Sequence, residues 1–519
     1  MDHHDAVVPG RTFNVKTQMK HLAQKNILVL GLGASGLALA RWCVRCGAQV
    51  TVADTRPAPP QLQTLQSSVS DAATFIHSEM NESLLSVAVF DLVLKSPGLS
   101  PDSVSSVIGA AEANGIACGN ELSLFAQALA DLKETQGYTP QVIGITGTNG
   151  KTTVTSLTTQ LVKSAGKSVA MAGNIGPTLL DTLAEKLDAG ALPEVWVLEL
   201  SSFQLDRINN FEPTVATVLN VTQDHLDWHE TLPAYAAAKT HVYGTCGLML
   251  LNRDDALVMA ALPPLVKGKQ VRPYLTFGND LPRRPGDYGI ETVNGMAWLV
   301  RAAEADETIK RRKIEEVALH IQRLMPLDAL LIRGRHNATN ALAALGLASA
   351  VGCTLAPMLF ALREYRGEPH RVESVAVIDE VEYFDDSKGT NVGATVAALA
   401  GLGAERKLVI ILGGEGKGQD FSPLVLPVSR YVRAVVLMGR DASQIRTALQ
   451  ESQVPLLDAA SMQEAVTVAA QQAKAGDAVL MSPACASFDM FDNYEHRAQV
   501  FCDAVRSLSQ TSLEQETVL

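Results

Sequence analysis

The segment Gly144–Thr153 (GITGTNGKTT) constrains the fold of this chain most strongly, because it lies between an apolar strand and an amphipathic helix. We expect the strand at Gln141–Ile145 and a helix that begins at Thr152. A glycine-rich turn in that position presents backbone N–H groups to phosphate oxygens, although Ile145 replaces the first glycine of the strict P-loop pattern. Lys151 is expected to neutralise β- and γ-phosphates and Thr152 to bind Mg²⁺. The turn therefore predicts a nucleoside triphosphate site.

Strands and helices alternate along the whole chain, which predicts an α/β protein whose parallel sheets are covered by helices. At roughly 150 residues per domain, 519 residues suggest three or four domains. We expect a polar linker at Asp131–Pro140, a charged and irregular surface excursion at about Pro282–Ile314, and a third series of strands from near Gly367. The predicted divisions are a disordered tail at 1–23 and domains at 24–130, 131–366 and 367–519.

The amino-acid composition narrows the classes of molecule that this chain is expected to bind. Fifty-five acidic residues against 43 Lys and Arg give a formal net charge of −12, which is not the footprint of a nucleic-acid-binding protein. The longest nearly continuous apolar run, Ala341–Cys353, is shorter than the ~18–20 residues that cross a bilayer, and no secretory signal is visible. Cys43 and Cys46 form one CxxC inside a helical pattern, where packing is favoured over redox chemistry or metal binding. We predict a cytoplasmic protein with neither nucleic acid nor membrane as partner.

Three ionisable residues after the glycine-rich turn are candidates for chemistry. Glu199 interrupts the apolar strand Glu194–Leu200, and because a buried carboxylate needs a partner, either Mg²⁺ or a salt bridge is expected there. His225 follows another apolar strand, at the strand end where α/β sheets bind ligands, although a structural role stays open. Lys239 lies in a following helix, and its pattern alone assigns it no role.

A second glycine-rich turn, Gly31–Gly36 (GLGASG), follows the strand Asn26–Leu30. Asp54 lies 18 residues after its last glycine, which is the form of a dinucleotide fingerprint. The pattern predicts a diphosphate with a ribose or sugar and does not decide whether the ligand is NAD. A dehydrogenase would leave the triphosphate site without a role. The two sites together favour an enzyme that uses ATP to activate a nucleotide-carried substrate.

Nine motifs between about residues 24 and 505 resemble those of the Mur ligases of peptidoglycan synthesis. They are TGTNGKTT, the Glu199 strand, NVTQDHLD, AAAK, GRHNATNALAAL, EPHRVE, DDSKGTN, GGEGKGQDFSPL and SPACASFDMF. The first five are shared with folylpolyglutamate synthases, and the last three are typical of the family member that attaches D-glutamate. The DNPR stretch of the ligase that adds the third residue is absent.

The resemblance implies a Rossmann-like N-terminal domain, a central P-loop ATPase-type domain and a C-terminal Rossmann-like domain, with a UDP-sugar rather than NAD in the first. The implied UDP-substrate residues are Ala34, Ser35, Asp54, Thr55, Arg56, Gly98 and Asn174. The implied ATP residues are Gly147, Thr148, Asn149, Gly150, Lys151, Thr152, Thr153, Asn337, Asn340, Arg371 and Asp386. The implied D-glutamate residues are His225, Lys388, Thr390, Lys417, Ser487 and Phe488. The implied catalytic residues are Lys151, Glu199, His225, Lys239 and Lys388.

The implied reaction is the ATP-dependent joining of D-glutamate to UDP-N-acetylmuramoyl-L-alanine through an acyl phosphate, by a monomer. Two Mg²⁺ ions are implied, one held by Thr152 and Glu199 and one by His225 and a carbamylated Lys239. Another Mur ligase or a folylpolyglutamate synthase-like amide ligase is the alternative. Glu415 and Tyr494 depart from the family pattern, which more often has Asp and Phe there.

Overall fold

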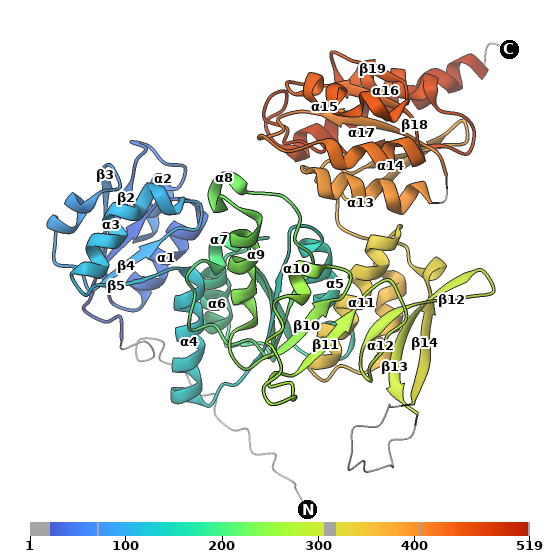
Figure 1. Cartoon of the computed structure of the whole chain (residues 1–519). Helices are drawn as coiled ribbons and strands as arrows, with labels where there is room; N and C mark the ends of the chain where they lie inside the picture. Colours follow the sequence, from blue (N-terminus) through green and yellow to red (C-terminus); the bar gives the residue numbers. More distant parts are fainter. Residues whose placement is uncertain (1–20, 70–71, 306–317, 405, 517–519) are drawn as a thin grey trace, which may run out of the picture. The chain divides into compact units, whose positions relative to one another are not determined.

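The computed structural model describes residues 21–69, 72–305, 318–404 and 406–516. Helices alternate with mostly parallel strands, which confirms the predicted α/β class (Figure 1). Described residues up to 144, with 167–214 and 241–247, form one compact unit, and the remaining described residues form a second. Residues 1–20 of the predicted tail lie outside the described residues, while Leu22 is buried.

Five parallel strands form the sheet β3-β2-β1-β4-β5 of the first unit. Their bounds are β1 Asn26–Leu30, β2 Gln49–Asp54, β3 Ala73–His77, β4 Leu92–Lys95 and β5 Ala117–Gly119. Residues 27–30 of the central strand have no exposed surface, as expected for a strand with helices on both faces. The helices after β1, β2 and β4 are α1 Ala34–Arg45, α2 Leu62–Val69 and α3 Pro101–Ala113.

Helix α4, Glu121–Gln136, corrects the predicted linker Asp131–Pro140. Its last turns are helical because Leu132 is fully buried and holds that stretch against the unit. Gly137, with φ of 70°, then ends the helix in the left-handed conformation that glycine adopts at little cost. The loop is therefore confined to residues 137–140.

A second sheet has the strand order β11-β10-β9-β6-β8-β7. Its strands are β6 Gln141–Thr146, β7 Val169–Gly173, β8 Val195–Glu199, β9 Val215–Val218, β10 Leu248–Asn252 and β11 Tyr274–Phe277. The helices of the first unit from this part of the chain are α6 Leu179–Asp188 and α7 Ser202–Leu205. Those of the second unit are α5 Lys151–Ser164, α8 Leu226–His229, α9 Leu232–Thr240, α10 Ala256–Met259, α11 Arg335–Ala350 and α12 Leu355–Glu364.

The surface excursion predicted at Pro282–Ile314 is in part regular structure. Three antiparallel strands, β12 Tyr288–Val293, β13 Met296–Glu304 and β14 Leu319–Pro326, form a sheet of their own. Leu299 and Val300 of β13 are fully buried, so an apolar face is hidden within the charged sequence. Residues 306–317 lie outside the described residues.

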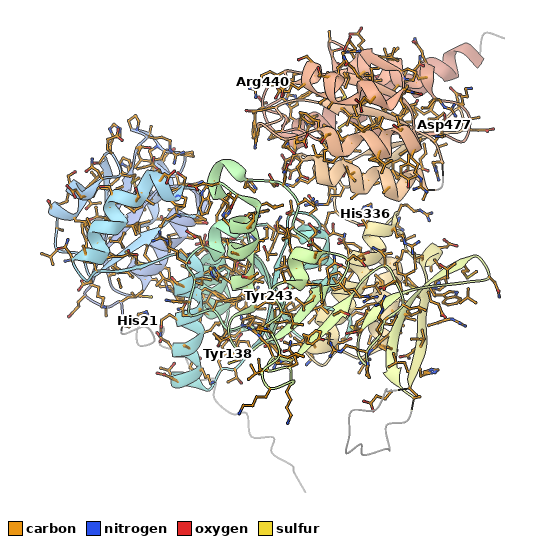
Figure 2. All side chains as sticks on the ribbon, viewed as in Figure 1. His21, Tyr138, Tyr243, His336, Arg440 and Asp477 are labelled. Atoms are coloured by element: carbon orange, nitrogen blue, oxygen red, sulfur yellow. The ribbon has the colours of Figure 1, made fainter. Side chains whose placement is uncertain are left out.

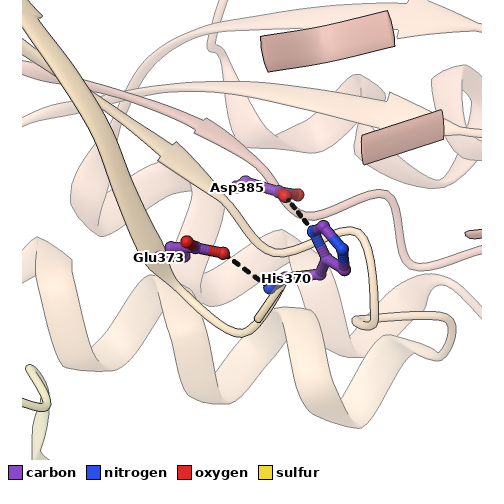
Figure 3. A group of neighbouring side chains, drawn as sticks. All are labelled: His370, Glu373 and Asp385. Carbon is purple, nitrogen blue, oxygen red and sulfur yellow. Dashed lines mark hydrogen bonds and ion pairs between the residues drawn. The ribbon is translucent and has the colours of Figure 1, made fainter. Parts of the chain in front are cut away.

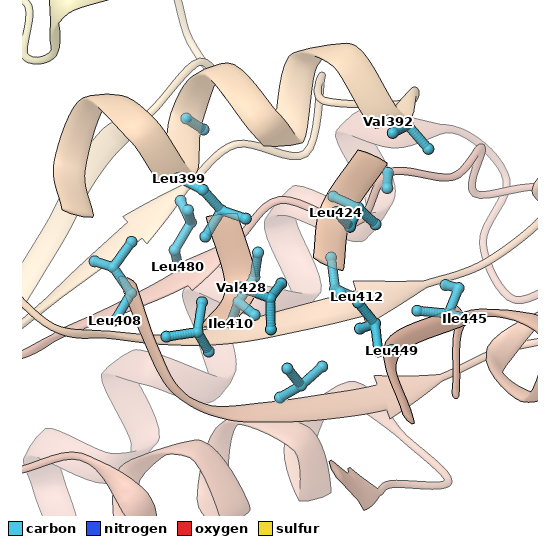
Figure 4. Close-up of a cluster of buried hydrophobic side chains, with 14 of the residues drawn as sticks. Val392, Leu399, Leu408, Ile410, Leu412, Leu424, Val428, Ile445, Leu449 and Leu480 are labelled. Carbon is cyan, nitrogen blue, oxygen red and sulfur yellow. The ribbon is translucent and has the colours of Figure 1, made fainter. Parts of the chain in front are cut away.

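The C-terminal sheet of the second unit has the order β15-β16-β20-β17-β18-β19, antiparallel only at β15. Its strands are β15 Glu373–Ile378, β16 Val381–Asp385, β17 Leu408–Gly413, β18 Val432–Met438, β19 Leu456–Asp458 and β20 Ala478–Met481. Its helices are α13 Val392–Gly403, α14 Val425–Tyr431, α15 Ala442–Leu449, α16 Met462–Gln472 and α17 Tyr494–Glu516. Alternate residues of β17 enter two cores: Ile410 faces the cluster in Figure 4, and Val409 faces the other side.

The CxxC cysteines are positioned for packing. Cys43 is fully buried in α1 and Cys46 follows the helix, and burial raises the pKa of both thiols, that of Cys46 to about 12. Protonated thiols are poor nucleophiles, which disfavours redox chemistry there. Among the described residues, every helix is too short or too polar to pass through a bilayer.

Candidate active site

The predicted phosphate turn joins β6 to α5 through two glycines with positive φ, Gly147 at 151° and Gly150 at 82°. A Cβ on Gly147 would lie 3.0 Å from the Cβ of Leu219, and one on Gly150 would lie 2.7 Å from Oδ1 of Asn340. Both positions therefore require glycine. The turn is also fixed from outside, because Asn220 accepts hydrogen bonds from the backbone N–H groups of Thr148 and Asn149, each at 2.9 Å.

Two predicted lysines meet at one carbonyl of this turn. Lys151 donates from Nζ to the carbonyl oxygens of Gly147 and Thr148, at 2.9 and 2.8 Å. Lys239 donates to the same Gly147 oxygen at 3.0 Å, and only 1% of Lys239 is exposed. Burial and then the neighbouring Lys151 charge hold the pKa of Lys239 well below its usual value. Lys239 thus has access to its neutral, nucleophilic amine form.

His225 and Lys239 share Tyr235 as a neighbour. The Lys239 ammonium lies 4.3 Å from the centroid of the Tyr235 ring, and the His225 ring stands edge-on to it at 6.3 Å. His225 has a φ of 52° and lies with Nε2 3.8 Å from Oδ2 of Asp224. The predicted second metal pair therefore lies around one aromatic ring, with a carboxylate beside it.

A cavity of about 230 Å³ in the second unit gathers many of the predicted residues. The predicted residues that line it are Asn149, Gly150, Thr153, Asn337, Asn340, Arg371, Asp386 and Lys388. They come from the phosphate turn and α5, from α11, and from the chain around β15 and β16, so segments more than 200 residues apart in the sequence meet here. The cavity carries amide, guanidinium and ammonium groups, which suit a nucleotide.

Arg371 and Asp386 lie on the C-terminal side of this cavity. Arg371 donates from Nη2 to the hydroxyl oxygen of Thr152 at 2.9 Å, so the predicted metal ligand of α5 has a cation beside it. Asp386 accepts a hydrogen bond from Ser482 at 2.6 Å. Burial raises the pKa of Asp386 to about 7, and Arg371 partly opposes that shift.

Three loops meet at the carboxyl ends of β16, β17 and β20, and they carry all the predicted D-glutamate residues except His225, which follows β9. Glu415 and Ala486 exchange two backbone hydrogen bonds of 2.9 Å, which joins the loop of Lys417 to the loop of Ser487. Lys388 follows β16, where its backbone N–H donates to the carbonyl of His370 at 3.1 Å. Carboxyl ends of parallel strands are where α/β sheets bind ligands.

The individual predicted residues differ in exposure. Ser487 is 2% exposed and Thr390 is half-buried, whereas Lys417 is exposed and has a φ of 51°. Phe488 is 66% exposed, so the structure gives its ring little to pack against. We retain all four as predictions.

Arg497 on α17 is a residue that the sequence pattern did not single out. It is 2% exposed and donates to the hydroxyl and the carbonyl of Ser387, at 2.9 and 2.8 Å, and to the carbonyl of Cys485 at 3.0 Å. These bonds hold the Lys388 loop to the Ser487 loop. A buried guanidinium with several acceptors is costly to replace.

His370, Glu373 and Asp385 form the group of acidic and imidazole side chains in the described residues that is compact enough to hold a metal (Figure 3). The His370 ring already bonds through Nδ1 to Oδ2 of the buried Asp385 at 2.7 Å. Its backbone N–H donates to Glu373 at 2.9 Å. Because the same His370 also accepts from Lys388, the group serves to fix the turn before that lysine.

The first unit holds the predicted UDP residues around Asp54. Its carboxylate accepts the backbone N–H of Leu32 at 2.7 Å and two hydrogen bonds from the Arg56 guanidinium, at 2.7 and 2.9 Å. The bonds from Arg56 lower the pKa of Asp54 to about 2. Ser35 lies half-buried and Ala34 exposed in the Gly31–Gly36 turn, while Thr55 and Arg56 are exposed after β2 and Gly98 follows β4.

Glu199 ends the buried strand β8, with 2% of its surface exposed. Asn174 donates from Nδ2 to Glu199 Oε1 at 3.1 Å, and Oε2 is buried with no hydrogen-bond partner among the described residues. An unpartnered buried carboxylate oxygen fits a cation such as Mg²⁺, for which hard oxygen ligands are preferred.

Three family models match the chain. They are the Mur ligase MurD-like N-terminal domain at residues 25–119, the Mur ligase middle domain at 145–348 and the Mur ligase glutamate ligase domain at 370–485. A UDP-N-acetylmuramoylalanine–D-glutamate ligase of Albidiferax ferrireducens is 66% identical, over 95% of this chain and 98% of that protein. One of Polaromonas sp. is 59% identical, over 96% and 100%. The chain belongs to the Mur ligase family.

Two solved structures have a fold similar to that of this Mur ligase. A MurF ligase of Thermotoga maritima in complex with ADP has a TM-score of 0.56 at 16% identity, covering 96% of this chain and 100% of that one. A UDP-N-acetylmuramate-alanine ligase of the same organism has a TM-score of 0.52 at 19% identity, covering 93% and 100%. The predicted family and fold class are confirmed.

Two further residues of this Mur ligase were not predicted, one that lines the cavity and one that bonds to Asn149 of its lining. His336, labelled in Figure 2, is the residue that lines the cavity. Its Nδ1 is shielded from solvent and has no hydrogen bond among the described residues. Burial lowers the pKa of His336 to about 4. Asn391 caps α13 and donates to Asn149 and Asp224, both at 3.2 Å. His336 lies within the GRHNATNALAAL motif and Asn391 within DDSKGTN, but only their contacts in the structure indicate a role.

Proposed function

We propose that this Mur ligase joins D-glutamate to UDP-N-acetylmuramoyl-L-alanine, with conversion of ATP to ADP and phosphate. The observation that carries the proposal is the match over nearly the whole length to relatives that bear this activity in their names, at 66% and 59% identity. A folylpolyglutamate synthase-like ligase is disfavoured, because residues 25–119 match a MurD-like N-terminal domain. Both nucleotide substrates are intracellular metabolites, so the proposal includes a cytoplasmic location.

A carboxylate must be activated before an amine can attack it. In the proposed reaction the L-alanine carboxylate attacks the γ-phosphorus of ATP, so a C–O–P bond forms as ADP leaves. The D-glutamate amine then attacks that acyl carbon, loses a proton, and displaces phosphate. Such phosphoryl transfer depends mainly on positioning and charge neutralisation.

The chain's residues would divide these tasks. Lys151, now held by two P-loop carbonyls, would turn its ammonium to the β- and γ-phosphates. Asn337 and Asn340 would contact the adenine end of the cavity, and Arg371 would exchange its bond to Thr152 for a phosphate. Asp54 would bind the ribose of the UDP-sugar, with Arg56 beside it. The D-glutamate site would be formed by His225, Lys388, Thr390, Lys417, Ser487 and Phe488.

Mg²⁺ would supply Lewis acidity and charge neutralisation at the phosphates and the substrate carboxylate. Thr152 and Glu199 would hold one ion, which the unpartnered Glu199 Oε2 supports. His225 and a carbamylated Lys239 would hold the other. The depressed pKa of Lys239 supports the modification, because only a neutral amine adds to CO₂.

Phosphate release from Mg-ATP with UDP-N-acetylmuramoyl-L-alanine tests the proposal, in parallel with D-glutamate, L-glutamate, L-lysine and no amino acid. We expect release only with D-glutamate, with an amide product of matching mass. Lys151→Met should abolish release, while Lys163→Met, a change at the far end of the same helix α5, should not. Release with another amino acid would leave the fold and the ATP site in place and refute the D-glutamate assignment.

A further inference from the structure

Glu121 is a buried carboxylate at the place where three helices of the first unit meet. It is the first residue of α4 and only 1% exposed, and α4 packs against both α1 and α6. Its Oε1 accepts the backbone N–H of Leu180, in the first turn of α6, at 3.1 Å. Its Oε2 is shielded from solvent and has no hydrogen-bond partner among the described residues. A carboxylate buried in this way is costly to keep charged.

The Ser35 side chain connects this carboxylate to the predicted UDP site. Ser35 lies in the Gly31–Gly36 turn at the start of α1, and its hydroxyl interacts with Glu121 so as to favour the charged carboxylate. A hydroxyl has one proton to donate, so its interaction with Glu121 competes with a hydrogen bond from Ser35 to a phosphate oxygen. A neutral Glu121 can itself donate to the Ser35 oxygen, which leaves the Ser35 proton to the ligand.

We propose that Glu121 is a positioning residue for the UDP-sugar, and that it takes up a proton when the diphosphate of the ligand binds at the Gly31–Gly36 turn. The proposal rests on the function proposed above, which places a UDP-sugar at Ser35. The proton comes from solvent and forms an O–H bond on the Glu121 carboxylate, and no other covalent bond changes. The Ser35 hydroxyl then donates to the diphosphate instead of to Glu121.

The groups around Glu121 support this exchange. Burial raises the pKa of Glu121 to about 7, and the Asp181 carboxylate of α6 adds to that effect. The backbone N–H groups of Leu180 and Leu179 oppose it, and Arg41 of α1 lies 3.9 Å from Asp181. Near pH 7 the residue is therefore balanced between its charged and neutral forms. The negative charges of a diphosphate at the start of α1 favour the neutral form, because like charges repel.

Titration calorimetry of the full chain with UDP-N-acetylmuramoyl-L-alanine tests the proposal, with a nonhydrolysable ATP analogue held at saturation. In the parent we expect Kd to rise about 5-fold from pH 6 to pH 8, because Glu121 must then gain a proton on binding. Binding enthalpies in buffers of different ionisation heat should show uptake of a fraction of a proton. Glu121→Gln imitates the neutral acid, so its Kd should match that of the parent at pH 6 and change less than about 2-fold up to pH 8.

Two further variants separate Glu121 from other groups that change charge. Glu112→Gln, at an exposed position of α3, is the matched control and should keep the full pH dependence of Kd. Histidine is the other type of side chain that changes charge near neutral pH. His77, the last residue of β3, lies with Nε2 3.1 Å from the carbonyl oxygen of Thr55, and His77→Gln should also keep that dependence.

Ser35→Ala tests the competition directly, since it should cost more affinity at pH 6, where the hydroxyl donates to the ligand, than at pH 8. An equal cost at both pH values would overturn the proposal. So would a pH dependence that persists in Glu121→Gln, weaker binding by Glu121→Gln at pH 6 and pH 8 alike, or loss of the dependence in His77→Gln. A parent protein that binds no UDP-N-acetylmuramoyl-L-alanine at either pH would instead overturn the proposed function.

Discussion

His336 lies so close to Gly401 that a Cβ on the glycine would stand 2.8 Å from the histidine Nδ1. The same Cβ would lie 3.2 Å from the Cα of Gly334. His336 is the second residue of α11 and Gly401 lies in α13, so a histidine packed between two glycines joins the helix of the predicted adenine contacts to α13. This approach depends on the missing side chain of Gly401.

Gly401→Ala should therefore weaken nucleotide binding without unfolding the protein. Alanine favours the helix by about 0.5–1 kcal/mol, but its methyl group pushes α13 from His336. We expect about a 10-fold rise in Kd for ADP, measured by titration calorimetry. Gly109→Ala in α3 is the control, because its Cβ would meet nothing within 4 Å. Equal ADP affinity in both variants would contradict the role of the contact.

The amine of Lys239 should react with CO₂. With ¹³C-bicarbonate, we expect a carbamate resonance in the parent protein and none in Lys239→Arg, since arginine offers no neutral amine. Activity in CO₂-free buffer should fall and recover on addition of bicarbonate. Lys163→Arg, an exposed lysine at the end of α5, should retain both the resonance and the response. A resonance that persists in Lys239→Arg would assign the carbamate to another lysine.

Asp54→Asn should destabilise the first unit by about 1–2 kcal/mol at pH 7, by loss of a buried, charge-assisted pair. The folded pKa of Asp54, about 2, is below its unfolded value, so the stabilisation is present above about pH 4 and is lost as pH falls toward 2. Urea unfolding of both proteins at pH 7 and pH 3 measures the difference. Asp188→Asn breaks a similar arginine pair with a 60% exposed carboxylate, and should cost less than about 1 kcal/mol.

Glu121 should make the first unit less stable as pH rises. Burial raises its folded pKa to about 7, so between the unfolded value and 7 the folded state binds the extra proton, and stability falls with increasing pH. Glu121→Gln keeps an acceptor for the Leu180 N–H, which now lies 3.1 Å from the carboxylate. Relative to the parent, this variant should gain on the order of 2–3 kcal/mol between pH 5 and 8 in denaturant titrations. Glu112→Gln, at a 56% exposed position, should show no such gain.

Local patterns in the sequence predicted those elements whose conformation depends mainly on their own residues. The phosphate turn needs glycines at Gly147 and Gly150 because of its own backbone, and the strand β1 has the bounds expected from its apolar run. The linker prediction was wrong because Leu132 is buried by tertiary packing that no local composition reports. The sheet β12-β13-β14 was not predicted, because the charged residues of its exposed face obscure in the sequence the apolar residues of its buried face.

The residues of the site could be predicted only where a recognisable sequence motif assigns them a role. Arg497 and His336 act through partners 110 residues and about 65 residues away, so their roles follow from the fold and not from spacing. Tyr494 departs from the family pattern in the sequence, but only the structure places its ring 3.6 Å from the Lys388 ammonium. The roles of the predicted residues and the domain limits remain predictions.

Helix α11 is buried on every side from Ala341 to Ala348, and it carries Asn337 and Asn340 at its start. Local opening of such a helix would expose apolar surface in all directions, so its amides should exchange with deuterium only when the second unit unfolds as a whole. The loop after β17 is exposed at Lys417 and Gly418, and its amides should exchange far sooner. One wall of the cavity is then as durable as the fold itself, whereas the exposed loop of Lys417 can rearrange many times within the lifetime of that wall.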